Sequence, residues 1–317
     1  MGLPSPPHPA ILACVSIYLP IAEMSVNVLV IIGLGALVGF LSGMFGVGGG
    51  FLTTPLLIFY GIPPAIAVAS SATQITGASV SGALAYWRRG GIDLKMGAVL
   101  TVGGIVGAGL GSVLFRFLQA LGQIDIAIGL IYVIFLGTIG GLMLTEAIGA
   151  VRRTRAGTAT PRRLHPHHPW IAALPWKMRF PKSGLYLSPL APLLLGGAVG
   201  VLTVIMGIGG GFIIVPAMIY LLGMSAGVVV GTSLFNIVFV TAAATLLHSV
   251  QSQTVDIVLA LLLLSGGVIG AQFGVRAAQR LQPEKLRLFL ALIVVGVAVR
   301  LAIGLTWRPD ELFTVYG

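Results

Sequence analysis

The chain has 317 residues, of which 57% are hydrophobic and only 8% are charged. Soluble domains carry about 25% charged residues, so this composition excludes an ordinary water-soluble protein. The single cysteine, Cys14, excludes an internal disulfide framework and a multi-cysteine metal site. The net charge of +10 lies in loops beside apolar runs, where it indicates membrane orientation rather than nucleic-acid binding.

Long apolar runs predict an all-α polytopic membrane protein, because a helix of about 20 apolar residues crosses a bilayer. The runs are continuously apolar and do not alternate, which excludes a transmembrane barrel. The runs 51–60 and 212–222 are too short to cross, and they predict half-helices or re-entrant segments. The predicted spans are residues 26–44, 65–87, 96–115, 126–145, 185–206, 224–247, 257–275 and 287–307.

The spans fall into two transmembrane repeats, residues 26–148 and 185–307, followed by a tail at 308–317. Residues 1–25 fit neither a full span nor a signal peptide; a half-span, or an upstream start with Met24 as the alternative start, are the options.

The repeats are separated by residues 149–184, which contain eight Lys or Arg and no acid. This composition predicts an extramembrane linker. Its HPHHP sequence, residues 165–169, is interpreted as part of a solvated linker. A metal site is the less favoured alternative, because clustered imidazoles separated by prolines lack a defined geometry.

A helix-breaking glycine cluster occurs once in each half. GVGGG at 46–50 returns as GIGGG at 207–211, and each cluster is followed by phenylalanine and, four residues later, by proline. A glycine cluster that opens a short helix exposes backbone N–H groups and the positive end of the helix dipole, so it can bind an anion without a charged side chain. Close helix packing through small residues is the alternative. The candidate substrate-binding glycines are Gly48, Gly49, Gly50, Gly209, Gly210 and Gly211.

Neither cluster is a nucleotide-binding loop, because no Gly-Lys-Ser/Thr follows and no βαβ unit surrounds it.

Polar residues recur at the same spacing in the span that follows each short run. Their hydroxyl and amide groups can donate hydrogen bonds to an oxyanion without burying an unpaired charge. Interhelical hydrogen bonding is the alternative. These candidates are Ser70, Ser71 and Gln74 in the first half, and Thr232, Ser233 and Asn236 in the second.

Equivalent loops of the two halves differ in their number of basic residues. Loop 88–95 has three bases, whereas its counterpart 248–256 has no Lys or Arg. The next pair is reversed, with one Arg in 116–125 and four bases in 276–287. Basic loops stay cytoplasmic, so the halves are predicted to be inverted-topology repeats with a cytoplasmic linker and a substrate site near the midplane.

Other features carry less chemistry. Glycines four apart at 103–111, with counterparts at 266–274, predict a packing stripe. Most acids, including Asp93 and Asp256, lie at span ends, so no proton relay is expected. Arg300 lies inside a span, where snorkelling to the outer interface is favoured over attraction of an anion.

The motifs GxxxGxxGVGGGFLTTPLL and SSATQI, with GIGGGFIIVPAM and GTSLFN in the second half, resemble the TauE/SafE sulfite exporter family of membrane permeases. The resemblance covers residues 26–305 and implies a multi-span permease of a prokaryotic plasma membrane. It also implies sulfite, sulfonates or related anions as substrates; the residues alone indicate only a small anion. The long basic linker and the first 25 residues depart from the family pattern.

The sequence therefore predicts a secondary transporter or facilitator whose partners are a small anionic substrate and membrane lipids. An anion channel that uses the same glycine site is the alternative. A membrane enzyme would need a catalytic constellation, and the sequence has no mid-span acid, paired histidine or activated cysteine. No cofactor or metal is expected.

Overall fold

The computed structural model describes residues 16–45, 50–155, 177–224, 226–278 and 283–306, and it confirms the predicted helical fold class. The first half contains α2 (Val28–Phe45), α3 (Gly50–Phe59), α4 (Pro64–Arg88), α5 (Leu94–Ala120) and α6 (Ile124–Arg155). The second contains α8 (Leu190–Met206), α9 (Gly211–Tyr220), α10 (Ala226–Leu247), the π-helical turn η1 (His248–Ser252), α11 (Ile257–Ala278) and α12 (Pro283–Thr306).

Among the described residues, five helical segments are long and apolar enough to cross a membrane. They are Leu94–Ala120, Ile124–Gly149, Val228–Ser252, Ile257–Gly274 and Leu288–Thr306. The short runs after the glycine clusters form the ten-residue helices α3 and α9, as expected from their length. The HPHHP sequence and the C-terminal tail lie outside the described residues.

A two-stranded antiparallel hairpin leads into the first helix of each half. Hairpin 1 pairs β1 (Ser16–Leu19) with β2 (Met24–Asn27), and hairpin 2 pairs β3 (Met178–Phe180) with β4 (Leu185–Leu187). The half-span considered for residues 1–25 is therefore wrong for residues 16–25, and the predicted span 26–44 starts too early, because Val26 and Asn27 belong to β2. The predicted span from residue 185 is also too long at its start: these residues pair as β4, and α8 begins after Pro189.

The basic segment that was predicted to be linker from residue 149 starts as helix, because α6 continues to Arg155.

The two hairpins match each other in turn chemistry and in helix capping. Each has proline after its first strand, Pro20 or Pro181. Glu23 and Gly184, at equivalent turn positions, both have positive φ, +50° and +67°. The Asn27 side chain accepts a hydrogen bond from the Leu29 N–H (2.9 Å), which caps α2. Ser188 accepts one from the Leu190 N–H (3.3 Å) at the start of α8.

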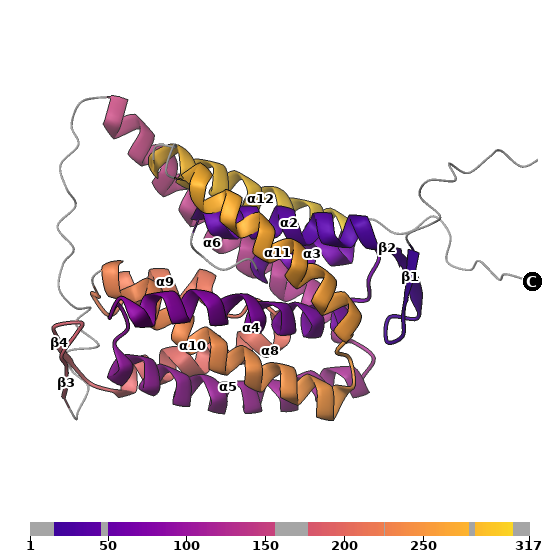
Figure 1. The fold of residues 1–317 in the computed structure, drawn as a ribbon, viewed down its shortest axis with the longest axis horizontal. Coiled ribbons are helices and arrows are strands. Elements are labelled where there is room, and N and C mark those ends of the chain that lie inside the picture. The colour runs from indigo at the N-terminus through magenta and orange to yellow at the C-terminus, as the bar shows by residue number, and fades with distance from the viewer. Residues whose placement is uncertain (1–15, 46–49, 156–176, 225, 279–282, 307–317) are drawn as a thin grey trace, which may run out of the picture.

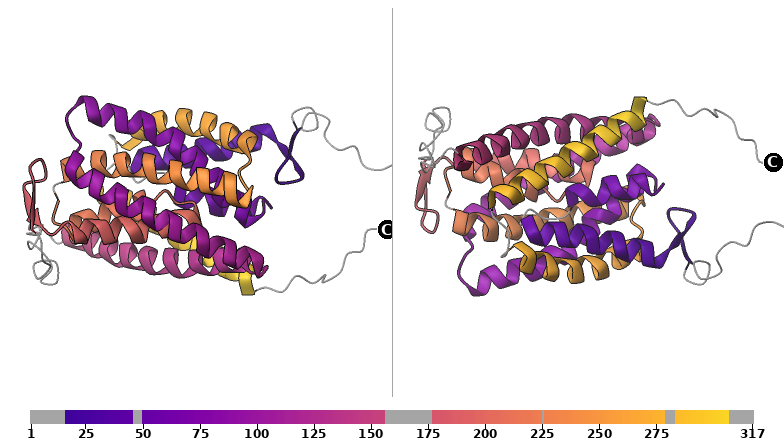
Figure 2. Two further views of the ribbon diagram at one scale, coloured as in Figure 1. Left: turned by 90° about the horizontal axis from the view of Figure 1, so that it is seen from below. Right: turned by 90° about the horizontal axis from the view of Figure 1, so that it is seen from above.

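The hairpins lie at opposite ends of the molecule, and the helices run roughly between these ends (Figure 1). The two further views in Figure 2 show the same separation. Apolar side chains of both hairpins are buried, Leu19 and Val26 in one and Phe180 and Leu187 in the other. Each hairpin is thus packed onto one end of the helix bundle.

The first helix of each half packs on the fourth helix of the other half, α2 against α11 and α8 against α5. Glycines make this contact close. A Cβ added to Gly107 would overlap the Gly197 carbonyl on α8, and one added to Gly270 would overlap the Ala36 carbonyl on α2. The predicted glycine packing stripes are therefore confirmed.

Two further helix pairs join the halves, and both are antiparallel. On α4 and α10, Thr73 donates to Thr245 (3.3 Å) and Thr76 donates to Thr241 (2.8 Å), so residue numbers rise along one helix as they fall along the other.

The same arrangement holds for α6 and α12. The Gly129 site lies beside Leu305 and the Gly140 site lies beside Val294.

Candidate functional site

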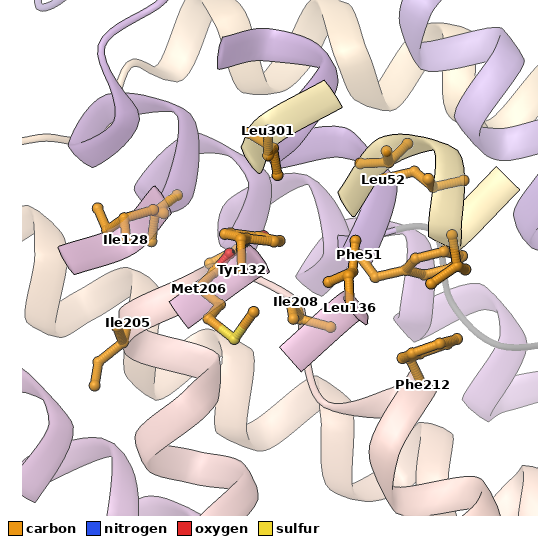
Figure 3. Packing of buried hydrophobic residues seen from close by; sticks show 14 of the residues in the cluster. Phe51, Leu52, Ile128, Tyr132, Leu136, Ile205, Met206, Ile208, Phe212 and Leu301 are labelled. Atoms are coloured by element: carbon orange, nitrogen blue, oxygen red, sulfur yellow. Dashed lines mark hydrogen bonds between the residues drawn. The ribbon is translucent and has the colours of Figure 1, made fainter. Parts of the chain in front are cut away.

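Gly50, the last residue of the first glycine cluster, meets the second cluster in the core. The rings of Phe51 and Phe212, which directly follow the clusters, stack with centroids 4.5 Å apart and planes 19° apart. A Cβ added to Gly50 would lie 2.5 Å from the Ile208 carbonyl oxygen, so Gly50 closely approaches the backbone of the second cluster. Figure 3 shows this meeting point, with Phe51 facing Phe212 beside Ile208. Gly48 and Gly49 lie outside the described residues.

The second cluster breaks the helix with backbone that favours glycine. α8 ends at Met206 and α9 begins at Gly211. Between them, Gly207, Gly209 and Gly210 have φ of +66°, +69° and +76°, the left-handed region that other residues rarely adopt. Gly210, at the N-cap of α9, has no side chain that could cap the first N–H groups of the helix. These are the groups that the sequence identifies as anion donors.

The broken end of α8 is held by side chains from other elements. The Met206 carbonyl accepts a hydrogen bond from the Thr54 hydroxyl of α3 (3.2 Å) and another from the Tyr132 hydroxyl of α6. Two residues earlier, the Val204 carbonyl lies 3.0 Å from Nε2 of His248, which packs edge-on against Phe115. These contacts satisfy carbonyls that a helix end would leave without partners inside the core.

Sequence reasoning missed both Tyr132 and His248. Tyr132 lies in an apolar span and is fully buried, whereas the Thr138 and Thr145 hydroxyls of the same span are exposed and bond within their own helix. His248 had been assigned to a loop, but it begins the π-helical turn at the end of α10 and is also buried. A polar side chain within an apolar span or at its end was the available signal, because such a group needs a partner.

Two of the predicted polar residues form hydrogen bonds between the halves. The Ser70 hydroxyl accepts from the backbone N–H of Asp256 (3.2 Å), and the Thr232 hydroxyl accepts from the backbone N–H of Asp93 (3.0 Å). Asp256 lies at the end with hairpin 1 and Asp93 at the end with hairpin 2 (Figure 1). The structure therefore places Ser70 and Thr232 at opposite ends rather than in one cluster.

Gln74 and Ser233 also have partners nearby. The Gln74 side-chain oxygen accepts from the Thr53 hydroxyl (3.3 Å), and the Ser233 hydroxyl donates to the Val230 carbonyl of its own helix (2.9 Å). Gln74 therefore connects α4 to the short helix α3, directly after the first glycine cluster.

Ser71 and Asn236 differ from the other predicted polar residues. Among the described residues, the Ser71 hydroxyl and both polar atoms of the Asn236 side chain are buried without a hydrogen-bond partner. Both residues are fully buried. Buried polar groups are nearly always paired, so these atoms are candidates for hydrogen bonds to a substrate.

The position of Ser71 ties it to the glycine clusters. It shares a face of α4 with Val68 and Ile75, which are three residues before it and four residues after it. A Cβ on Gly207 would contact the Val68 backbone, and the Ile75 side chain lies against the Gly50 and Gly209 sites. The unpaired hydroxyl therefore lies on the face of α4 that covers both clusters.

Asn236 lacks the kind of partner that its counterpart, Gln74, has in the first half. Gln74 is paired with Thr53, but the position equivalent to Thr53 in the second half is Ile214, which has no hydroxyl. The Asn236 oxygen lies 3.5 Å from the Cβ position of Gly104, at the contact between α10 and α5. Gln74 is thus paired within its own half, whereas the Asn236 amide has no partner among the described residues.

The fold and this site define a multi-pass helical membrane protein with a broken-helix core. The family model for the sulfite exporter TauE/SafE matches residues 31–301, and the chain belongs to this family of membrane transporters. The expected family resemblance is therefore confirmed.

Named relatives are described as transporters. The chain is 29% identical to "Probable membrane transporter protein YjnA" of Bacillus subtilis over 88% of this chain and 100% of that protein. It is 30% identical to a "Probable membrane transporter protein" of Xylella fastidiosa over 86% of this chain and 94% of that protein. "Sulfite exporter TauE/SafE family protein 3" of Arabidopsis thaliana is 27% identical over 38% of this chain and 26% of that protein. No solved structure matches the chain.

Proposed function

We propose that the protein is a permease for a small sulfur oxyanion, sulfite or an organosulfonate, which binds where the two glycine clusters meet. The observation that carries this proposal is the uncapped start of α9 buried in the core, with the unpaired Ser71 hydroxyl on the helix face that covers it. The N–H groups and helix dipole would attract the anion, and neutral side chains would orient it. Membership of the sulfite exporter family supports sulfite as the substrate class.

In this proposal, the substrate site is built from the residues identified by the sequence. The central contacts are Gly50, Gly209, Gly210 and Gly211 with Ser71, and Asn236 binds the anion from the second half. Gln74 and Ser233 orient the helices around the anion. Ser70 on α4 and Thr232 on α10 act at opposite ends of the molecule. Gly48 and Gly49 complete the first cluster.

We also propose that the two halves are inverted-topology repeats that move by alternating access. Equivalent helices α4 and α10 contact each other antiparallel, as do α6 and α12, which supports a two-fold axis in the membrane plane. The exchanged pairs α2–α11 and α8–α5 support the same axis. Rocking of the halves would expose the site to each side in turn.

The proposed location is a prokaryotic plasma membrane with the hairpin 2 end in the cytoplasm. The exposed bases Arg88, Arg89, Lys95, Arg179 and Lys182 lie beside that hairpin or in the loop that it contacts. Basic residues flanking spans favour the cytoplasmic side. The linker 149–184 would lie on the same side.

The test is uptake of labelled sulfite into proteoliposomes by the wild type and by Asn236→Leu. Leucine has a similar shape and removes a buried amide that has no partner, so thermal stability should be unchanged or higher. Uptake should fall at least about tenfold, the effect of losing one hydrogen bond to a charged ligand. Unchanged uptake in Asn236→Leu would remove this residue from the site.

The matched control is Gln74→Leu, which breaks the pair with Thr53 and should lower stability by about 1 kcal/mol. A carrier should show saturable uptake accelerated by unlabelled sulfite on the opposite side. The alternative, an anion channel, would instead give currents that rise linearly with voltage and no such acceleration.

A further inference from the structure

Asp93 and Asp256 occupy equivalent positions at the starts of α5 and α11, and both are buried, with 1% and 0% of their surface exposed. One oxygen of each carboxylate caps its own helix. Asp93 accepts from the Met96 N–H (3.2 Å), and Asp256 accepts from the Leu259 N–H (3.0 Å). Helix capping uses only this one oxygen, so a capping role alone would not require a partner for the second oxygen of each carboxylate.

The second oxygen of each carboxylate instead binds a hairpin of the other half. Asp93 Oδ2 accepts from the backbone N–H (2.9 Å) and the hydroxyl (2.6 Å) of Ser183 in hairpin 2. Asp256 Oδ2 accepts from the backbone N–H of Ile21 in hairpin 1 (3.2 Å). The same type of contact is therefore built twice, once at each end of the molecule (Figure 1).

The backbone of the same two residues reaches the helices that carry the proposed site. The Asp256 N–H donates to Ser70, next to Ser71 on α4, and the Asp93 N–H donates to Thr232, next to Ser233 on α10. Each aspartate thus joins a hairpin to a substrate helix of the proposed site through a single residue.

We propose that Asp93 and Asp256 are positioning residues that close two gates, with hairpin 2 and hairpin 1 as the respective lids. The inference rests on the proposed function for the substrate that passes these gates. A buried carboxylate is stable only while its donors are in place, so a hairpin that departs must be replaced by water. Each contact therefore has two states, closed and dry or open and hydrated, as alternating access requires.

Apolar side chains complete each seal. Leu19 and Val26 of hairpin 1 pack in one buried cluster with Leu57 and Leu259, from the ends of α3 and α11 at that side.

The other end repeats this arrangement. Phe180 and Leu187 of hairpin 2 pack with Met218 of α9 and Met96 of α5. Because both carboxylate contacts are formed at once, the structure is in the conformation closed at both ends.

The test uses two cysteine reporters in a Cys14→Ser background, Ser71→Cys and Ser233→Cys, labelled by a membrane-impermeant methanethiosulfonate reagent added to one side of vesicles. Asp256→Asn should raise the labelling rate of Ser71→Cys roughly tenfold from the hairpin 1 side, since it weakens hydrogen bonds to a charged acceptor. It should leave Ser233→Cys unchanged from the hairpin 2 side.

Asp93→Asn should do the reverse, and the exposed Asp125→Asn is the control that changes neither rate. Ser183→Ala keeps the carboxylate and removes one donor, so it should open only the hairpin 2 side by about two- to threefold, the weaker effect of one hydroxyl. Ser183→Ala also tests the hairpin 2 gate if Asp93→Asn does not fold. Equal increases from both sides, or no increase, would overturn the proposal.

Transport by the double variant separates a gate from a merely structural role. Each single substitution should bias the protein toward opening at one side and slow exchange, whereas the Asp93→Asn, Asp256→Asn double variant should recover part of the lost rate. Defects that only add would contradict the gate. The labelling is done without substrate, so it remains informative even if the protein proves not to carry sulfite.

Discussion

The rings of Phe51 and Phe212 stack at 4.5 Å across the boundary between the two halves of the chain. Each ring directly follows a glycine cluster, so the stack fixes the relative position of the two helix breaks. Both side chains are almost fully buried. The stack therefore adds a side-chain contact to the close backbone approach of Gly50 and Ile208.

Replacing the stacked rings should reveal coupling between the halves. Phe51→Leu and Phe212→Leu should each destabilise the protein, and the double variant should differ from their sum by about 1 kcal/mol, as for other aromatic pairs. Thermal unfolding in detergent measures this difference. Phe51→Leu combined with Phe239→Leu, which lies on α10 against Phe235, is the control and should be additive.

The Met206 carbonyl should tolerate the loss of one donor but not of two. Tyr132→Phe and Thr54→Val each leave the other hydroxyl in place, so each should cost about 1 kcal/mol or less. The double variant leaves a buried carbonyl unpaired and should cost about 1–3 kcal/mol beyond the sum. Thr138→Val, at an exposed hydroxyl bonded within its own helix, should change stability by less than about 0.5 kcal/mol.

Two glycines on α2 should respond in opposite directions to the same substitution. A Cβ on Gly39 would overlap the Gly267 carbonyl of α11, whereas one on Gly33 has no atom within 4 Å. Gly39→Ala should destabilise by about 1–3 kcal/mol through overpacking. Gly33→Ala should stabilise by about 0.5–1 kcal/mol through higher helix propensity. Unfolding temperatures would test both, and equal losses would contradict the assigned helix contact.

The turns of the two hairpins should be accessible from opposite sides of the membrane. Glu23 and Lys182 are both exposed turn residues. In a Cys14→Ser background, Glu23→Cys should react with an impermeant maleimide added to intact cells, and Lys182→Cys should react only after the inner side is opened. Labelling of both from one side would contradict the inverted topology and the gates together.

The helix breaks and packing stripes could be predicted because they depend on glycine, whose spacing is visible in the chain. Gly107 and Gly270 mark positions where the backbone of another helix comes close. The partner helix was not predictable, since a small residue indicates that another backbone comes near and does not identify which one. Only the structure therefore shows that α2 and α8 each pack on a helix of the other half.

The hairpins were missed for a different reason. Strands of three or four residues have too few positions for a period of two to stand out next to long apolar runs. The paired prolines Pro20 and Pro181, with Glu23 and Gly184 at the turns, were the available signal. An aligned comparison of the two halves that extended before residue 26 would have found them.

Prediction was least successful for the polar residues. The repeated spacing correctly selected side chains that are buried, but it treated Ser70 and Ser71 alike. Ser70 bonds to Asp256 and Ser71 has no partner among the described residues. Neighbouring residues on a helix point in directions about 100° apart, and sequence alone does not show which direction leads to a donor.

The exchange of first helices imposes an order on biosynthesis. When α2 leaves the ribosome, its glycine-lined face has no partner until α11 is made, because Gly39 must wait for Gly267. Contacts between segments so far apart in the chain form late. The newly inserted N-terminal half therefore remains unfinished in the bilayer, and it should be open to degradation until the last third of the chain arrives.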